Sequence, residues 1–132
     1  MNISQETVAT IRSLKKSAKK IGLISNADVA EISGWDKSPL APLFDSVIFS
    51  CNVGFAKPQK EIYGLGLSAL RTPSQKAVFV GDGNCRELEG AKAVGLTTVM
   101  MTGYIGDLKP EKIQERKKFA DYSITALREL VD

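Results

Sequence analysis

The stretch "VFVGDGNCRELEGAKAVG", residues 78–95, joins a short apolar run, a glycine-flanked aspartate and a segment with helical periodicity. The apolar residues 78–80 predict a buried strand, and the glycines beside Asp82 predict a turn where that strand ends. From Glu87 onward, apolar residues recur at the spacing of one helical face. A connection between a strand and a helix needs a turn, but it does not need an acid at its tip. Asp82 is therefore a candidate functional residue.

The rest of the chain repeats the alternation of apolar strands and amphipathic helices. Strands are expected at 20–25, 46–50, 76–81, 96–101 and, as a short one, 120–124; helices are expected at 4–19, from Pro58, near 109–118 and from about Thr125. Strands that are apolar throughout and alternate with helices predict a parallel sheet covered on both faces. We predict an α/β, Rossmann-like fold in one domain over residues 1–132.

Composition excludes several classes of function. With 132 residues, 43% of them apolar, and a net charge of +3, the chain has the balance of an ordinary globular domain, and its charge is too mild to argue for nucleic acid. The basic clusters at 15–20 and 116–118 are best read as solvated helix faces. Histidine is absent, which excludes histidine bases, Ser-His-Asp and Cys-His systems and histidine-bound zinc.

Cysteine usage and hydropathy bear on the compartment. Cys51 and Cys85 stand far apart without a Cys-x-x-Cys motif, which favours a reduced, cytoplasmic protein. No apolar run approaches the ~20 residues that cross a bilayer, so no membrane partner is expected.

Polar residues gather at the predicted ends of the strands, where ligands bind in sheets of this kind. Ser25 and Asn26 close the first strand, Asp82 closes the third, and Lys57 ends the loop after the second. We expect these groups to converge on one edge of the sheet. There, Ser25 can donate to a phosphate oxygen, Lys57 can offset the phosphate charge, and Asp82 can bind a divalent cation.

Each of these residues also has a purely structural interpretation. Ser25 suits the N-cap of a helix over 26–33, Lys57 is an acceptable loop lysine, and Asp82 can hydrogen-bond its own turn. Glu87 is favoured in a first helical turn by the helix dipole. Trp35 is expected to pack locally beside "SPLAPLF" (38–44) and is given no site role.

The ordered combination is more specific than its parts. The stretches "IGLISNA" (21–27), "LFDSVIFSCNVGFAKPQKEIY" (43–63) and "VFVGDGNCRELEGAKAVGL" (78–96) resemble the haloacid dehalogenase (HAD) superfamily of hydrolases from residue 8 to about 105. The pattern is most similar to the phosphoglycolate-phosphatase-like branch, whose cap domain precedes the Ser-Asn strand. The resemblance implies a phosphatase of small phosphate esters that works with Mg²⁺ through an aspartyl-phosphate.

The family's motifs then fall on particular residues. The second motif falls on Ser25, the third on Lys57 and the fourth on Asp82. The resemblance makes Ser25 and Lys57 catalytic, gives phosphate binding to Ser25, Asn26 and Lys57, and makes Asp82 a metal ligand. Glu87 stands where a second aspartate is more usual, so it binds the metal or instead holds Lys57.

The family's first motif, Asp-x-Asp, is missing, because no two aspartates of the sequence are spaced by one residue. The chain therefore resembles the C-terminal portion of such an enzyme, without nucleophile and cap, and we expect it to be inactive alone. In the family's strand order, 3-2-1-4-5, the absent strand is the central one, between the strands at 20–25 and 76–81. Those two strands would close together, or a second copy (a homodimer, favoured over closure) or a complementing N-terminal segment would cover the gap.

Other functions remain open from the sequence. A non-catalytic remnant or regulatory half that binds a partner through its unfilled sheet is the main alternative. A dehalogenase of the same superfamily fits less well, because Lys57, Asp82 and Glu87 suit a dication and a phosphate. A receiver-like module is weakest, because it needs paired acids after its first strand.

Overall fold

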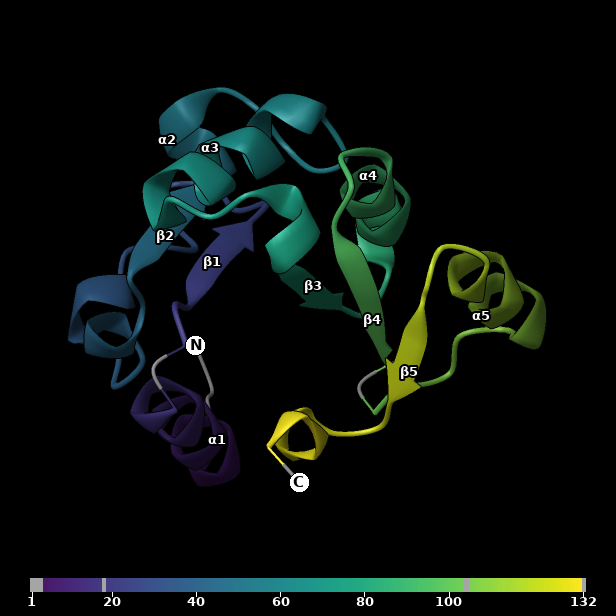
Figure 1. Cartoon of the computed structure of the whole chain (residues 1–132), viewed down its shortest axis with the longest axis horizontal. Helices are drawn as coiled ribbons and strands as arrows, with labels where there is room; N and C mark the ends of the chain where they lie inside the picture. Colours follow the sequence, from purple (N-terminus) through teal and green to yellow (C-terminus); the bar gives the residue numbers. More distant parts are fainter. Residues whose placement is uncertain (1–3, 18, 104, 132) are drawn as a thin grey trace.

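The structure is a computed structural model that describes residues 4–17, 19–103 and 105–131. Parallel strands alternate with helices along the chain, as the sequence predicts (Figure 1). The strands are β1 (Gly22–Ser25), β2 (Ser46–Phe49), β3 (Val78–Gly81), β4 (Thr97–Met101) and β5 (Tyr122–Ile124). The α-helices are α1 (Gln5–Lys16), α2 (Ser50–Val53), α3 (Lys60–Leu70), α4 (Glu87–Ala93) and α5 (Pro110–Lys117).

The strands form two separate parallel sheets. β1 pairs with β2, and β3, β4 and β5 pair in that order. In the part of the chain that the structure describes, no ladder joins β1 to β3. Of the three alternatives for these strands, direct closure, the one less favoured than a homodimer, is therefore not observed, and the place of a central strand stays open between them.

Apolar packing at two places joins the part of the molecule that contains β1 and β2 to the part that contains β3, β4 and β5. Beneath α3 and α4, Ile24 of β1 and Phe79 of β3 pack against one cluster that contains the fully buried Ile62. On the other side of the molecule, α1 packs on the C-terminal 3₁₀ helix η5 (Leu127–Leu130), where an ion pair of 2.9 Å joins Glu6 to Arg128. The chain thus forms a ring around the open strand position (Figure 1).

Local structure departs from the predicted elements at three places. No helix forms over 26–33, which is a series of turns, and α3 begins at Lys60, because the residue before it has extended backbone angles. The expected helix from Thr125 is reduced to the four residues of η5, and the Glu129 carboxylate caps its start by accepting hydrogen bonds from the backbone N–H groups of Thr125 and Ala126. Short-range periodicity alone does not register such capping by a side chain.

Residues 33–42, for which the sequence predicted no role, contribute Trp35 and Leu40 to the hydrophobic core. Trp35 is 8% exposed and lies in the 3₁₀ helix Trp35–Lys37, with its ring 5.7 Å from Phe44 and 5.8 Å from Phe49. The prediction that Trp35 packs locally is confirmed. Both cysteines are free and exposed, and no described helix has the length and hydropathy needed to cross a bilayer.

Asp121 connects β4 to the segment that precedes β5. Its carboxylate accepts hydrogen bonds from the Lys92 ammonium and from the backbone N–H of Thr98. These two interactions, the lysine first, lower the pKa of Asp121 below its ordinary value of 3.8.

Replacing Asp121 with Asn is expected to remove part of the protein's loss of stability in acid. A carboxyl with a lowered folded-state pKa stabilises the fold above its unfolded pKa, and this stabilisation disappears as the pH falls through the lowered value. Thermal unfolding measured from about pH 5 to about pH 2 should therefore show a steeper fall of Tm for the wild type than for Asp121→Asn. Asp107→Asn, at an exposed position, should behave as the wild type. Equal slopes for wild type and Asp121→Asn would contradict the role of this carboxylate.

Candidate functional site

The end of β1 is tied directly to the loop that carries Lys57. The Asn26 side chain accepts a hydrogen bond from the backbone N–H of Lys57 at 2.8 Å and donates one to its carbonyl at 3.0 Å. This reciprocal pair brings together two segments that lie 31 residues apart in the sequence. Asn26, predicted to bind phosphate, thus has a structural task at the same place.

Lys57 reaches from this loop to the start of α4. Its ammonium lies 2.7 Å from Glu87 Oε1, and the two side chains are only 13% and 8% exposed. The same ammonium lies 5.7 Å from the centre of the Phe79 ring. Lys57 is therefore not an ordinary loop lysine, because it is held, largely out of solvent, at the junction of the two half-sheets.

Both carboxylate oxygens of Glu87 make contacts at this junction. Oε1 pairs with Lys57, and Oε2 accepts a hydrogen bond of 3.0 Å from the backbone N–H of Gly83. A Cβ at position 81 would collide with this carboxylate, which explains the glycine before Asp82. Of the two roles predicted for Glu87, the geometry supports the one in which it holds Lys57.

Small residues in α4 allow this close approach. A Cβ at Gly90 would come within 2.8 Å of the carbonyl oxygen of Pro58 and 2.7 Å of the Tyr63 hydroxyl. Only glycine lets α4 lie so near the Lys57–Pro58 loop. The small-residue helix after Asp82 is thus a packing requirement of the site.

Asp82 lies at the end of β3 with its side chain 39% exposed. Its Oδ1 accepts a hydrogen bond of 2.8 Å from the Asn84 N–H, so the turn interaction expected of an aspartate is present. Oδ2 has no hydrogen-bond partner among the residues that the structure describes. Arg116 of α5 donates to the backbone carbonyl of Asp82 at 2.9 Å and lies 4.0 Å from Oδ1.

Ser25 ends β1 and is paired with Phe49 in the ladder to β2. Because the segment 26–33 is not helical, the N-cap alternative for Ser25 has no helix to serve. Its neighbour Asn26 contacts Lys57, Lys57 contacts Glu87, and Glu87 contacts Gly83 next to Asp82. Direct contacts thus join Asn26, Lys57 and Glu87, whereas Ser25 and Asp82 are connected to this set as chain neighbours of Asn26 and Gly83.

Tyr63 and Arg116 belong to this site and were missed by the sequence interpretation. Tyr63 is fully buried in α3 and donates a hydrogen bond of 2.7 Å to the backbone carbonyl of Glu87. Desolvation first, and then the nearby Glu87 charge, raise the pKa of its phenol. Helical spacing gives a signal for burial at position 63 but none for this contact, and nothing in the sequence ties Arg116 to Asp82.

Tyr63→Phe is expected to lower the free energy of unfolding by about 1–2 kcal/mol, because it removes the buried hydrogen bond between the Tyr63 hydroxyl and the Glu87 carbonyl. The folded-state pKa of Tyr63 is raised, so its stabilisation is present below the unfolded pKa of about 10 and is lost as the pH rises further. Urea unfolding at neutral and alkaline pH checks both effects, with Tyr122→Phe, at a position that is 66% exposed, as the control. An unchanged urea midpoint for Tyr63→Phe at neutral pH would contradict the role of the hydroxyl.

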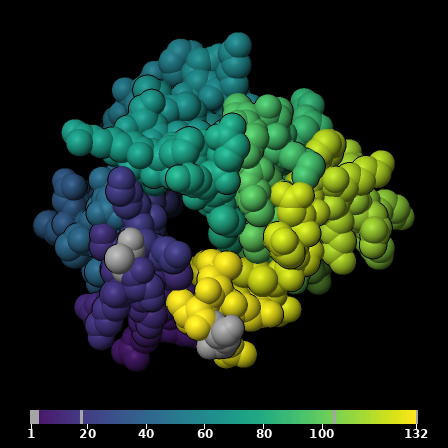
Figure 2. Space-filling view, viewed as in Figure 1, coloured from purple at the N-terminus to yellow at the C-terminus, as the bar shows by residue number. Residues whose placement is uncertain are grey.

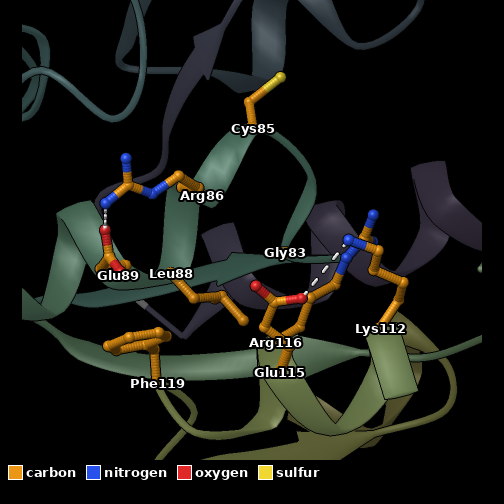
Figure 3. A pocket seen from close by; sticks show the side chains of 9 residues that line it. All are labelled: Gly83, Cys85, Arg86, Leu88, Glu89, Lys112, Glu115, Arg116 and Phe119. Atoms are coloured by element: carbon orange, nitrogen blue, oxygen red, sulfur yellow. Dashed lines mark hydrogen bonds and ion pairs between the residues drawn. The ribbon is translucent and has the colours of Figure 1, made fainter. Parts of the chain in front are cut away.

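A cavity of about 250 Å³ lies beside the site, between α4 and α5 (Figure 3). Arg86 faces Glu89 and Lys112 faces Glu115 there (Figure 3). Arg116, the third cation of the lining, contacts Asp82 outside the cavity. Ser25, Lys57 and Asp82 do not line the cavity. It is a groove between helices with little excess charge, and we assign it no ligand.

The residues at the end of β3 provide part of a site that suits a magnesium ion. In the described part of the chain, no three carboxylates, cysteines or histidines gather as a metal-binding group. Asp82 offers one half-exposed carboxylate, and Mg²⁺ is commonly held by one or two carboxylates together with phosphate oxygens and water. Glu87 is not available without breaking its pair with Lys57.

The sequence is similar to that of a known protein family. A family model described as haloacid dehalogenase-like hydrolase matches residues 2–95. The chain belongs to this family. Its parallel sheets flanked by helices confirm the predicted α/β, Rossmann-like fold of HAD proteins.

Individual HAD relatives extend the match over nearly the whole chain. The glyceraldehyde 3-phosphate phosphatase of Methanocaldococcus jannaschii is 32% identical over 130 residues, which cover 96% of this chain and 54% of the relative. A ribulose-1,5-bisphosphate 5-phosphatase of Halopiger xanaduensis is 27% identical over 100% of this chain and 56% of its own length. The crystal structure of a HAD phosphatase from Thermococcus onnurineus superposes with a TM-score of 0.82 at 28% identity, over 98% of this chain and 56% of that one. The chain thus spans about half the length of the relatives that it matches.

Proposed function

We propose that this chain carries the phosphate-handling half of a Mg²⁺-dependent phosphatase that acts on a small phosphate ester. The observation that carries the proposal is the Lys57–Glu87 pair, which fixes a largely buried ammonium beside the ends of β1 and β3. A fixed positive charge at this place suits a transferring phosphoryl group, because it stabilises negative charge without reorganisation. The phosphatase names of two HAD relatives support a phosphorylated substrate.

The residues have distinct tasks in this proposal. The Ser25 hydroxyl donates to a phosphate oxygen, Lys57 offsets the phosphate charge, and Asn26 keeps the Lys57 loop against β1 beside the anion. Glu87 positions Lys57 rather than the metal. Asp82 holds Mg²⁺, which, when bound, neutralises charge on the phosphate oxygens.

The covalent step needs an aspartate that this sequence does not provide in an Asp-x-Asp motif. A carboxylate oxygen attacks phosphorus, the bond to the ester oxygen breaks, and a second carboxyl gives that oxygen its proton. Water then cleaves the aspartyl-phosphate. We therefore propose that the chain is inactive alone and active when an Asp-x-Asp strand is supplied, and that it works in the reducing cytoplasm with both thiols free.

Hydrolysis of p-nitrophenyl phosphate with Mg²⁺ tests this function, with and without a polypeptide that supplies the missing motif. A non-catalytic, partner-binding half is the second candidate, and the edges of β1 and β3 that have no strand partner among the described residues favour it. Binding of the supplying polypeptide without any hydrolysis would select this second candidate.

A further inference from the structure

The turn that carries Asp82 holds three residues in the left-handed region of backbone space. The φ angles of Gly83, Cys85 and Arg86 are 91°, 57° and 56°. Glycine adopts such angles freely, whereas Cys85 and Arg86 are strained there because each carries a Cβ. Strained backbone of this kind persists only where the surrounding structure fixes it, and it concentrates at functional sites. Contacts from outside the turn are therefore needed to hold Asp82 in place.

Two side chains from different helices supply such contacts. Oε2 of Glu87, the first residue of α4, accepts a hydrogen bond of 3.0 Å from the backbone N–H of Gly83. Nη1 of Arg116, near the end of α5, donates a hydrogen bond of 2.9 Å to the backbone carbonyl of Asp82. The Arg116 contact thus acts on Asp82 itself, although Arg116 lies 34 residues farther along the chain.

Gly83 also makes room for Arg116. A Cβ at position 83 would lie 2.7 Å from Cδ and 3.0 Å from Cβ and Cγ of Arg116, so the stem of the arginine packs directly on the turn. The arginine side chain is only 21% exposed. α5 lies at the periphery of the molecule, away from the hollow at its centre (Figure 2). Arg116 therefore restrains the turn from the outer side of the ring.

The position of the Asp82 carboxylate follows from this restraint. Oδ1 accepts a hydrogen bond of 2.8 Å from the Asn84 N–H and lies 4.0 Å from Nη1 of Arg116. Oδ2 has no hydrogen-bond partner among the described residues. With its carbonyl held by Arg116 and its Oδ1 held by Asn84, Asp82 presents Oδ2 as an open ligand oxygen. Residues that orient a metal ligand commonly change the metal affinity by about 10–100-fold.

We propose that Arg116 is a positioning residue for the metal-binding carboxylate, which it holds from α5 so that Oδ2 of Asp82 stays available to a divalent cation. This inference rests on the proposed function, in which Asp82 binds Mg²⁺. The charge of the guanidinium has the opposite effect, because it repels a metal ion. Both side chains are partly exposed, so solvent weakens that repulsion, whereas solvent does not restore a lost orientation. Removing Arg116 should therefore weaken metal binding.

The test titrates the intact chain with Mn²⁺, a paramagnetic substitute for Mg²⁺, and follows the backbone amide signals by NMR. In the wild type, Mn²⁺ should broaden the signals of Gly83 and Asn84 first. In Arg116→Met, the Mn²⁺ concentration that gives half of this broadening should rise about tenfold. Amide hydrogen exchange at Asn84 should also become about tenfold faster, because the carboxylate that accepts this N–H is no longer fixed. Methionine keeps an apolar stem against Gly83, so the variant should fold.

Three further variants separate positioning from charge and from stability. Arg116→Lys keeps the charge and a donor, and it should recover most of the affinity, because the contact with the Asp82 carbonyl is a single hydrogen bond. Lys117→Met removes a charge from the exposed next position of α5 and should bind Mn²⁺ as the wild type does. Arg116→Gln should repeat the loss seen in Arg116→Met, and it decides the test if the methionine variant fails to fold.

The outcomes separate this inference from the proposed function. Weaker Mn²⁺ binding by Arg116→Met with recovery in Arg116→Lys supports the positioning role. It does so even if the chain and the polypeptide that supplies Asp-x-Asp show no hydrolysis, a result that contradicts the phosphatase proposal alone. Unchanged or tighter Mn²⁺ binding by Arg116→Met overturns the positioning role, even if its Tm is lowered, and leaves the proposed function standing. Broadening in the wild type that is not centred on Asp82, or that survives in Asp82→Asn, overturns both the metal role of Asp82 and this inference.

Discussion

Assayed alone with p-nitrophenyl phosphate and Mg²⁺, the chain is expected to turn over about 10⁶ times more slowly than a complete enzyme of its kind. The reason is that removing a covalent nucleophile from a hydrolase costs a factor of this order, and the sequence holds no Asp-x-Asp pair. Mixing the chain with a polypeptide that covers the unmatched part of the Methanocaldococcus jannaschii relative should restore hydrolysis. The measurement is release of p-nitrophenol by each component and by the mixture.

Variants of the chain show whether the restored activity uses the predicted residues. Lys57→Met should lower kcat of the mixture by about 10²–10³, because it removes a fixed charge from the transition state. Asp82→Asn should raise the Mg²⁺ concentration needed for half-maximal rate. Turnover by the chain alone that disappears in Asp82→Asn would show that the missing-nucleophile argument is wrong.

Glu87→Gln is expected to destabilise the free chain by about 3 kcal/mol, or roughly 10 °C in Tm. The change keeps the size of the side chain but leaves Lys57, whose side chain is only 13% exposed, without its counter-charge. Removing one partner of a buried ion pair is costly because the other charge remains desolvated. Thermal and urea unfolding measure this loss.

A surface pair provides the matched control. Lys112 and Glu115 lie 3.6 Å apart with both side chains 65% exposed, so Glu115→Gln should change the free energy of unfolding by at most about 0.5 kcal/mol. The double variant Lys57→Met with Glu87→Leu should be more stable than Glu87→Gln, because no unpaired charge remains. A Tm for Glu87→Gln within about 2 °C of the wild type would contradict the structural role of the pair.

Local chemistry in the sequence was sufficient for the order and type of most elements. The apolar runs at 20–25, 46–50, 76–81 and 96–101 each contain a strand, because strands of a parallel sheet flanked by helices are apolar along most of their length. The boundaries of the elements were predicted less accurately than their order. The helix expected from Thr125, for example, is reduced to the four residues of η5.

The sequence by itself also determined which groups are available for chemistry: one hydroxyl, one amide, one ammonium and one acid at strand ends, with no histidine and no Asp-x-Asp. Only the tertiary structure decided how they are used. It placed Glu87 on Lys57, gave Asn26 the task of holding the Lys57 loop, and brought Tyr63 and Arg116 to the same junction. It also left β1 and β3 apart. The physical reason is that these contacts join segments 24 to 34 residues distant in the chain, and which partners meet there depends on how whole helices and strands pack.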